Sequence, residues 1–364
     1  MLKRFTHVLA LACVGLGGCD RPAPTQSPAA ARLPIERQVA VPIGVRAMTQ
    51  NMYVGADLDA VIGALASPDP GDDVPALLLA VQTLGATDYP ARAGAFAREI
   101  ARAHPDVVGL QEVSKIDIDL TALGLPTVVH LDFLAILLDS LAARGLHYAV
   151  AASVRNIVAQ PVPGIELQDF DAMLVNPDRV KVSGTVARNY SNNLGVAAPG
   201  IDLERGYVVV QATMAGRLVA FASTHLESGD SPGIPDLRAA QAQELAAALP
   251  AGVPLLVMGD FNDTPGTAAY GVMAGAGLTD TWGALRRGAE GFTCCEAPDL
   301  GNRTPVLDQR IDYVWLRASL EGQDRGGNSV ERVGALPSDR IPGPEHSIWP
   351  SDHAGLVFQT TDFR

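Results

Sequence analysis

The sequence predicts an α/β fold in which two mixed β-sheets pack face to face between outer layers of helices, a four-layer sandwich. Three observations lead to this prediction. Apolar segments of strand length recur along the 364 residues, and amphipathic helical segments separate them. Some strand segments are joined by short turns, which makes antiparallel hairpins. Hydrophobic residues make up 48% of the chain, which is enough to bury the sheet faces under covering helices.

The first third of the chain is expected to supply two strands and a covering helix. Residues 43–54 read as a strand that ends near Asn51. A polar, Pro-rich interval follows and then two helical stretches, of which the second spans 90–106 and has its apolar residues on one face. The segment 54–90 is therefore an insertion between the first strand and its helix. The apolar run 106–113 reads as a second, buried strand.

The rest of the chain alternates between helices and strands. Helices are expected at 129–145 and 236–249, and a hairpin at 207–228 turns at Ala215 and Gly216. The remaining predicted strands are a strand–turn–strand unit at 170–184 and single strands at 255–260, 310–316 and 353–361.

The N-terminus is expected to be an export signal. Lys3 and Arg4 precede the short apolar stretch FTHVLALACVGLGG, which is too short for a comfortable membrane span. Its ending, LGGC, resembles a bacterial lipoprotein signal. That resemblance implies that residues 1–18 are removed and that Cys19 is lipidated. The alternative is an ordinary secretory signal with an incidental cysteine.

The chain after the signal is expected to be a tethered single domain. Residues 19–39 are rich in Pro and Ala and read as a tether, and residues 40–364 form the folded domain. The lipid places the protein at the periplasmic face of a bacterial membrane, and Asp20 resembles the residue that retains some lipoproteins at the inner membrane. We expect a monomer. The adjacent pair Cys294 and Cys295 forms either a vicinal disulfide or two buried thiols, and we favour the thiols.

The charge of the chain argues against a protein dedicated to nucleic acid. The formal net charge is −13, and removal of the signal takes away two bases and no acid. Proteins that hold nucleic acid by its backbone usually present a basic face, and no basic, aromatic-rich run is present. Nucleic acid stays an allowed partner, because a bound cation offsets acidic groups locally.

Polar residues stand at the ends of most predicted strands. Each one alone is ordinary turn chemistry, but strands that lie side by side bring their ends together. Clustered carboxylates repel each other unless a cation is present, and oxygen ligands of this kind suit Mg²⁺. The residues are Asn51, Glu112, Asp171, His225, Asp260, Asn262, Asp312, Asp352 and His353.

Six short motifs resemble the endonuclease/exonuclease/phosphatase superfamily, whose members include DNase I-like nucleases, neutral sphingomyelinases and inositol-polyphosphate phosphatases. They are QNMY, GLQEV, STHLES, GDFND, RIDYV and SDHAG, in the order and approximate spacing of that family. The resemblance covers roughly residues 40–361. It implies a DNase I-like fold and hydrolysis of phosphate esters by in-line attack of water, with Mg²⁺ or Mn²⁺ as cofactor.

The resemblance also implies roles for single residues. Glu112 and Asn51 match metal-binding positions, and Asp352 matches a further contact to the metal or to water. Asp352 reaches the site only through a local turn, because neighbouring residues on a strand face opposite ways. His353 matches the catalytic histidine and Asp312 the carboxylate that orients it.

The same resemblance assigns roles on the substrate side. Asp260 matches the carboxylate that aligns or deprotonates the attacking water. Asn262 and His225 match groups that hydrogen-bond the phosphoryl oxygens. Asp171 falls where relatives often carry an acid or an amide in the site.

Three functions compete at this stage. The first is a phosphodiesterase or phosphomonoesterase of the cell envelope, acting on a phospholipid or a small organic phosphate. The second is an exported nuclease for DNA or RNA, and the third is a non-catalytic binding lipoprotein. Segments 54–90 and 187–206 are expected to shape the substrate mouth. Arg303 and Arg310 are candidates for holding a substrate anion, with a surface ion pair as the alternative.

Overall fold

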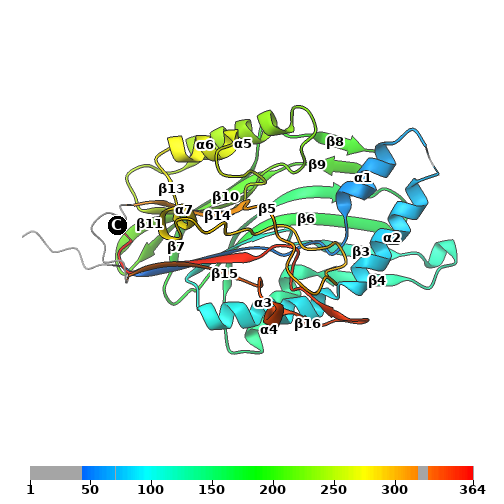
Figure 1. Ribbon diagram of the computed structural model, residues 1–364, viewed down its shortest axis with the longest axis horizontal. Coiled ribbons are helices and arrows are strands. Elements are labelled where there is room, and N and C mark those ends of the chain that lie inside the picture. Colours follow the sequence, from blue (N-terminus) through cyan, green and yellow to red (C-terminus); the bar gives the residue numbers. More distant parts are fainter. Residues whose placement is uncertain (1–42, 70, 319–326, 364) are drawn as a thin grey trace, which may run out of the picture. The chain divides into compact units, whose positions relative to one another are not determined.

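The computed structural model describes residues 43–363 except residue 70 and residues 319–326. These residues form two β-sheets packed face to face with helices on both outer surfaces, so the predicted fold class is confirmed (Figure 1). The predicted signal, Cys19 and most of the tether lie outside the described residues. Among the described helices, none has the length and apolar character that a bilayer crossing requires.

The larger sheet has both parallel and antiparallel pairs. Its centre is the parallel pair β1 and β2, flanked by antiparallel neighbours. A hairpin, β3 (Lys115–Asp119) and β4 (Val128–Asp132), pairs through β3 with the first residues of β6, whose last residues pair with β2. In spatial order its strands are β15 (Asn328–Val333), β18 (Gly355–Thr360), β1 (Val45–Asn51), β2 (Val107–Gln111), β6 (Ile165–Val175), β5 (Ala149–Ala159), β9 (Ile201–Leu203) and β8 (Gly195–Ala198).

The smaller sheet also pairs one parallel couple, β11 with β12, inside antiparallel neighbours. The hairpin of β10 and β11 turns at Ala215 and Gly216, as predicted. A separate two-stranded ribbon joins β16 (Ile341–Pro342) to β17 (Ser347–Ile348). The strand order is β13 (Thr279–Asp280), β14 (Asp312–Arg317), β12 (Leu255–Asp260), β11 (Arg217–His225), β10 (Gly206–Met214) and β7 (Lys181–Asn189).

Three apolar layers hold the sandwich together. Residues such as Phe221, Met258 and Phe358 fill the space between the two sheets. On the outside of the smaller sheet, α5 (Ile234–Ala248) and α6 (Ala268–Gly275) bury their apolar faces. On the outside of the larger sheet, α3 (Tyr89–Ala103) and α4 (Phe133–Ala142) do the same, and Figure 1 shows the two helix pairs on opposite sides. The short elements are α7 (Thr281–Leu285), η1 (Thr121–Leu123) and η2 (Pro337–Asp339).

A buried arginine of α3 anchors two loops at one end of the larger sheet. Arg92 is fully buried and donates to the carbonyls of Met52 at 2.6 Å and Tyr53 at 3.0 Å, directly after β1. The same guanidinium donates to the carbonyl of Pro350 at 3.2 Å, just before β18. Burying a charge is expensive unless it is hydrogen-bonded, so these carbonyls fix the loops as much as they satisfy the arginine.

Two sequence predictions need correction. The helix expected at 129–145 begins only at Phe133, because Val128–Asp132 pairs as β4 and Asp132 caps α4 through Ala135 N at 3.1 Å. The interval after β1 contains two helices of its own, α1 (Leu58–Ala66) and α2 (Asp73–Ala86), so three helices precede β2 instead of two. One of the two was missed in the sequence because its apolar residues show no clear helical periodicity.

Candidate functional site

Three site residues stand at one level on adjacent strands of the smaller sheet. His225 ends β11 and pairs in register with Asp260, which ends β12. Asp260 in turn pairs with Asp312, the first residue of β14. All three side chains are almost fully buried. The pairing therefore sets their spacing through the backbone, before any side-chain contact is formed.

Gly259 makes the close approach of β11 and β12 possible. Its φ is +148°, and a Cβ at this position would lie 2.0 Å from the carbonyl oxygen of Thr224. Only glycine avoids that collision. The glycine of the GDFND motif is thus a requirement for placing His225 beside Asp260.

His353 and Asp312 form a hydrogen-bonded pair. The Nδ1 of His353 lies 2.8 Å from Asp312 Oδ2, and its Nε2 lies 3.8 Å from Asp260 Oδ2. Burial lowers the pKa of His353, but Asp312, Asp352 and Asp260 outweigh it and raise the pKa well above its ordinary value. The ring therefore carries its second proton at Nε2, on the side of Asp260.

Asp260 lies at the centre of this group. It accepts from Asn51 Nδ2 at 3.0 Å and from the backbone N–H of Asn262 at 2.9 Å. Burial, followed by the charge of Asp312, raises the pKa of Asp260 to about 7. A carboxylate with a pKa near neutrality suits a general base. The side chain of Asn262, whose backbone is left-handed with φ 48°, donates to the carbonyl of Leu226 at 3.0 Å.

The predicted metal-binding residues meet at the end of the larger sheet. Asn51 Nδ2 also donates to Glu112 Oε1 at 2.9 Å, and Glu112 Oε2 accepts from Val54 N at 2.8 Å. Glu112 has φ 56°, so the chain bends sharply as β2 ends. Asp352 reaches the site through a turn, because Ser351 Oγ donates to the Asn51 carbonyl at 2.8 Å and accepts from His353 N at 3.1 Å.

These residues fit a hard divalent cation. Burial raises the pKa of Asp352 to about 7, and the charge of Glu112 adds to the increase. The nearby charges of His353 and Arg92 do not offset this increase. Glu112 and Asp352 offer the carboxylate oxygens that Mg²⁺ and Mn²⁺ prefer. Asn51 donates through Nδ2 and its Oδ1 accepts from Tyr53 N at 2.9 Å, so its amide has to rotate before it offers an oxygen to a cation. A second group, Asp260, Asp312 and His353, has one ligand atom from each residue within 4.8 Å of the others.

Glu112, Asp352, Asp260 and His353 line one polar cavity of about 290 Å³, and Asn262 and His225 also contribute to its wall. Asn51 and Asp312 are not lining residues and act on the cavity through their hydrogen bonds to Glu112, Asp260 and His353. Asp171 does not line this cavity; Asp169, two residues earlier on β6, does. Burial raises the pKa of Asp169 to about 7, and Ser114 Oγ donates to it at 2.8 Å. Burial also raises the pKa of Asp171 well above its ordinary value, and the charge of Asp169 adds to the increase.

Arg205 is a site residue that the sequence did not reveal. Its side chain is buried in the cavity wall, 3.2 Å from Glu227 Oε1 and 3.2 Å from His225 Nδ1. Burial, Arg205 and His353 lower the pKa of His225 well below its ordinary value. The neutral His225 then accepts at Nδ1 and carries its proton at Nε2, which lies 3.5 Å from Asp260. Arg205 falls in the segment 187–206, where a single charged residue is indistinguishable from the charged residues of an ordinary surface loop.

The two arginines proposed as anion ligands lie elsewhere. Arg310 is buried, pairs with Asp280 at 2.8 Å and stacks over Tyr313 at 4.9 Å, so the ion-pair alternative is the correct one for it. Arg303 is exposed and is not part of the cavity wall.

The two cysteines do line the cavity. The structure joins Cys294 to Cys295 in a disulfide, which corrects our preference for thiols. One atom of each cysteine lies within 4.8 Å of a ring nitrogen of His353.

A model of the endonuclease/exonuclease/phosphatase family matches residues 48–353. This chain belongs to that family. Among curated relatives, the Ccr4 exoribonuclease subunit of the CCR4-Not complex from Emericella nidulans is 27% identical over 127 residues. That stretch is 29% of this chain and 18% of the relative, so the whole relative's activity does not transfer directly.

Solved structures of family members share the fold. A protein from Beutenbergia cavernae superposes with a TM-score of 0.56 at 22% identity, covering 88% of this chain and 72% of its own. A family protein from Leptotrichia buccalis gives 0.55 at 15% identity, covering 87% and 99%. The human Nocturnin catalytic domain with bound sulfate gives 0.51 at 19%, covering 87% and 93%. At these identities the likeness shows the DNase I-like fold.

Proposed function

We propose that this protein hydrolyses phosphate esters, preferably phosphodiesters, with the help of a divalent cation. The observation that carries the proposal is the convergence of two groups on one cavity. The pair His353 and Asp312 meets Asp260 on one side, and Asn51 joins Asp260 to Glu112 on the other. Membership of the family supports phosphodiester chemistry in general.

The chain's own residues supply a base, an acid and oxyanion contacts. Asp260 accepts a proton from the attacking water, since its pKa of about 7 leaves it available near neutral pH. Asp312 orients His353 so that Nε2–H donates to the leaving oxygen. Arg205 and the Nε2–H of His225 face the charge that develops on the phosphoryl group.

Glu112 and Asp352 would hold the cation, and Asn51 would join them through Oδ1 after rotation of its amide. When bound, it supplies positive charge that stabilises the phosphoryl oxygens in the transition state.

A substrate panel tests this proposal. Purified protein is assayed with Mg²⁺ or Mn²⁺ on bis-p-nitrophenyl phosphate, sphingomyelin, phosphoinositides and DNA, and again in excess EDTA. We expect hydrolysis of at least one diester with metal and none in EDTA, with activity restored by added Mg²⁺. Full activity in EDTA, or equal rates for wild type and His353→Ala, would contradict the proposal.

A nuclease is the second candidate, because the curated relative is named as a 3′-5′-exoribonuclease. The net charge of −13 argues against it, since nucleic-acid grooves are usually basic. The same panel separates the two. A nuclease degrades DNA or RNA with a steep loss of rate at higher salt, whereas a small-ester or lipid enzyme leaves both intact.

We also propose that the mature protein is anchored to the cell envelope through lipid on Cys19. The support is the LGGC ending of the export signal and the tether that follows it. Cells fed an alkyne-palmitate analogue should label the wild type and not Cys19→Ser. Equal labelling of both would exclude the anchor, and release of Cys19→Ser into the soluble fraction is the accompanying expectation.

A further inference from the structure

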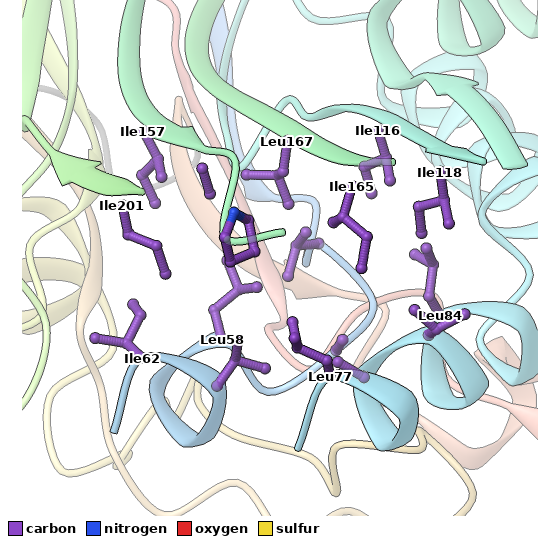
Figure 2. A pocket seen from close by; sticks show the side chains of 17 residues that line it. Leu58, Ile62, Leu77, Leu84, Ile116, Ile118, Ile157, Ile165, Leu167 and Ile201 are labelled. Atoms are coloured by element: carbon purple, nitrogen blue, oxygen red, sulfur yellow. The ribbon is translucent and has the colours of Figure 1, made fainter. Parts of the chain in front are cut away.

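A second cavity, wholly apolar, lies beside the polar one. It occupies about 80 Å³ between the inserted helices α1 and α2 and the strands β3, β5, β6 and β9. Figure 2 shows side chains of both walls pointing toward one another, with Leu58, Ile62 and Leu77 from the helices facing Ile157, Ile165 and Leu167 from the strands. All 17 lining residues are Val, Ala, Leu, Ile or Pro.

The apolar cavity adjoins the polar cavity, and the two share part of their walls. Val54, Ala56, Leu58, Ile62 and Ile157 line both. Val54 is also the residue whose backbone N–H donates to Glu112. The apolar cavity therefore lies next to the position of a phosphate at Glu112, with Val54 in the wall between them.

The chemistry of the wall selects the occupant. No lining side chain of the apolar cavity carries a donor or an acceptor. A nucleobase or a sugar would leave its polar groups without hydrogen-bond partners there, which costs free energy for each group. A hydrocarbon chain has no such groups and gains free energy with each methylene that it buries.

Exposed apolar residues stand on the elements around this cavity. Val74 and Leu79 of α2 are 61% and 63% exposed, and Val196 of β8 is 78% exposed. Figure 1 places α1, α2, β4 and β8 at the same end of the molecule. Exposed apolar residues on elements at one end of a protein agree with a contact to an apolar partner there.

We propose that the apolar cavity binds the aliphatic chain of a phospholipid whose phosphate occupies the polar cavity. This inference rests on the proposed function and names its substrate class. The helices α1 and α2 then serve as the chain-binding wall, and the exposed apolar residues of α2 and β8 face the lipid surface from which the substrate enters.

A chain-length series tests the proposal. The substrates are p-nitrophenyl alkyl phosphates with methyl, butyl and octyl groups, below their micelle concentrations; water adds to phosphorus and p-nitrophenolate leaves. In wild type, KM should fall about fourfold for each methylene added until the cavity is full, the fold-change that corresponds to ~0.8 kcal/mol per buried CH₂.

A plug variant supplies the matched comparison. Ala80→Phe fills the cavity from α2, and Gln82→Phe adds the same ring to an exposed position of that helix. Ala80→Phe should raise the KM of the octyl ester to that of the methyl ester and leave methyl-ester hydrolysis unchanged. Gln82→Phe should behave as wild type. A second plug from the opposite wall, Ile118→Phe, replaces Ala80→Phe if that variant does not fold.

Failure of the chain site differs from failure of the enzyme. If wild type hydrolyses the methyl ester but KM does not depend on chain length, the chain site is wrong and the proposed function stands. If no ester is hydrolysed, calorimetry with octyl phosphate against methyl phosphate decides. Tighter binding of octyl phosphate, with a negative heat-capacity change, supports the chain site, and equal binding overturns it. Cleavage of nucleic acid with no effect of chain length also overturns it.

Discussion

The polar and apolar cavities share five wall residues, yet they are built in opposite ways. The polar cavity lies where strands end, and its side chains are held by register, hydrogen bonds and left-handed residues such as Glu112 and Asn262. The apolar cavity lies between an inserted helix pair and the far strands of the larger sheet, and only packing shapes it. In the polar cavity the positions of the reactive side chains are fixed. In the apolar cavity only the volume and the apolar character of the wall matter.

The difference has an energetic side. The polar cavity holds several buried carboxylates whose pKa values are raised to about 7, so it contributes little or negatively to stability when empty. The aliphatic side chains that line the apolar cavity are removed from water and carry no charge. Substitutions in the first should therefore change rate and pH response, and substitutions in the second should change affinity for chains.

The largest effect is expected for the pair His353 and Asp312. His353→Ala and Asp312→Asn should each lower kcat by a factor on the order of 10² to 10⁴, the usual scale for acid–base assistance. Since the two act as one unit through the 2.8 Å hydrogen bond, the double variant should lose little more than either single one. The loss should be equal for methyl and octyl esters, which separates it from an effect on the apolar cavity.

Matched exposed residues provide the control for this pair. His346→Ala and Asp308→Asn change the same residue types at exposed positions and should leave kcat unchanged. Melting temperatures are measured in parallel. Single losses that multiply in the double variant, or losses that follow the melting temperature, would show that the pair is structural.

The next effect concerns the cation. Glu112→Gln removes one charge where the amide of Asn51 and the N–H of Val54 converge. The Mg²⁺ concentration for half-maximal rate should rise about 10- to 100-fold, comparable to other losses around metal ligands. The exposed Glu290→Gln is the control, measured by the same titration. An unchanged midpoint for Glu112→Gln would remove this residue from the metal site.

The smallest effect is on stability. Because the pKa of Asp169 is about 7 in the folded protein against an ordinary 3.8, its contribution to stability is complete below 3.8 and is lost as the pH rises through 7. Asp169→Asn keeps an acceptor for Ser114 and removes this loss. In EDTA its melting temperature should exceed that of wild type by about 2–4 °C at pH 8, with a smaller gap at pH 5. The exposed Asp202→Asn should show no such trend.

Most of the polar cavity could be predicted because its residues sit next to strong strand signals. Asp260 follows an apolar run and a glycine, and its neighbours in space end other runs of the same kind. The family motifs then added which ends meet. Asp171 was predicted from the family resemblance, and Asp169 was not considered. Both lie on the same face of β6, and the local pattern does not say which of them reaches the cavity.

The remainder depended on tertiary contacts that leave no local trace. Arg205 precedes β10 in a loop-like setting, and only its position beside His225 shows its part in the site. Val128–Asp132 has the apolar content of a helix start, but it forms a strand because it pairs with β3. The apolar cavity arises from residues on two helices and four strands, none of which is unusual by itself.

The position of the helix pair α1 and α2 along the chain has a consequence for how this enzyme diverges. The pair lies wholly between Tyr53 and Tyr89, while the groups proposed to carry the reaction lie outside that stretch. The residues proposed for the reaction and those proposed to select the substrate's chain thus come largely from separate stretches of the sequence. Under the proposal of a chain site, exchange of residues 58–86 should change which substrates are accepted and keep the contact of Val54 N–H with Glu112, so new specificities would arise by replacement of this one segment.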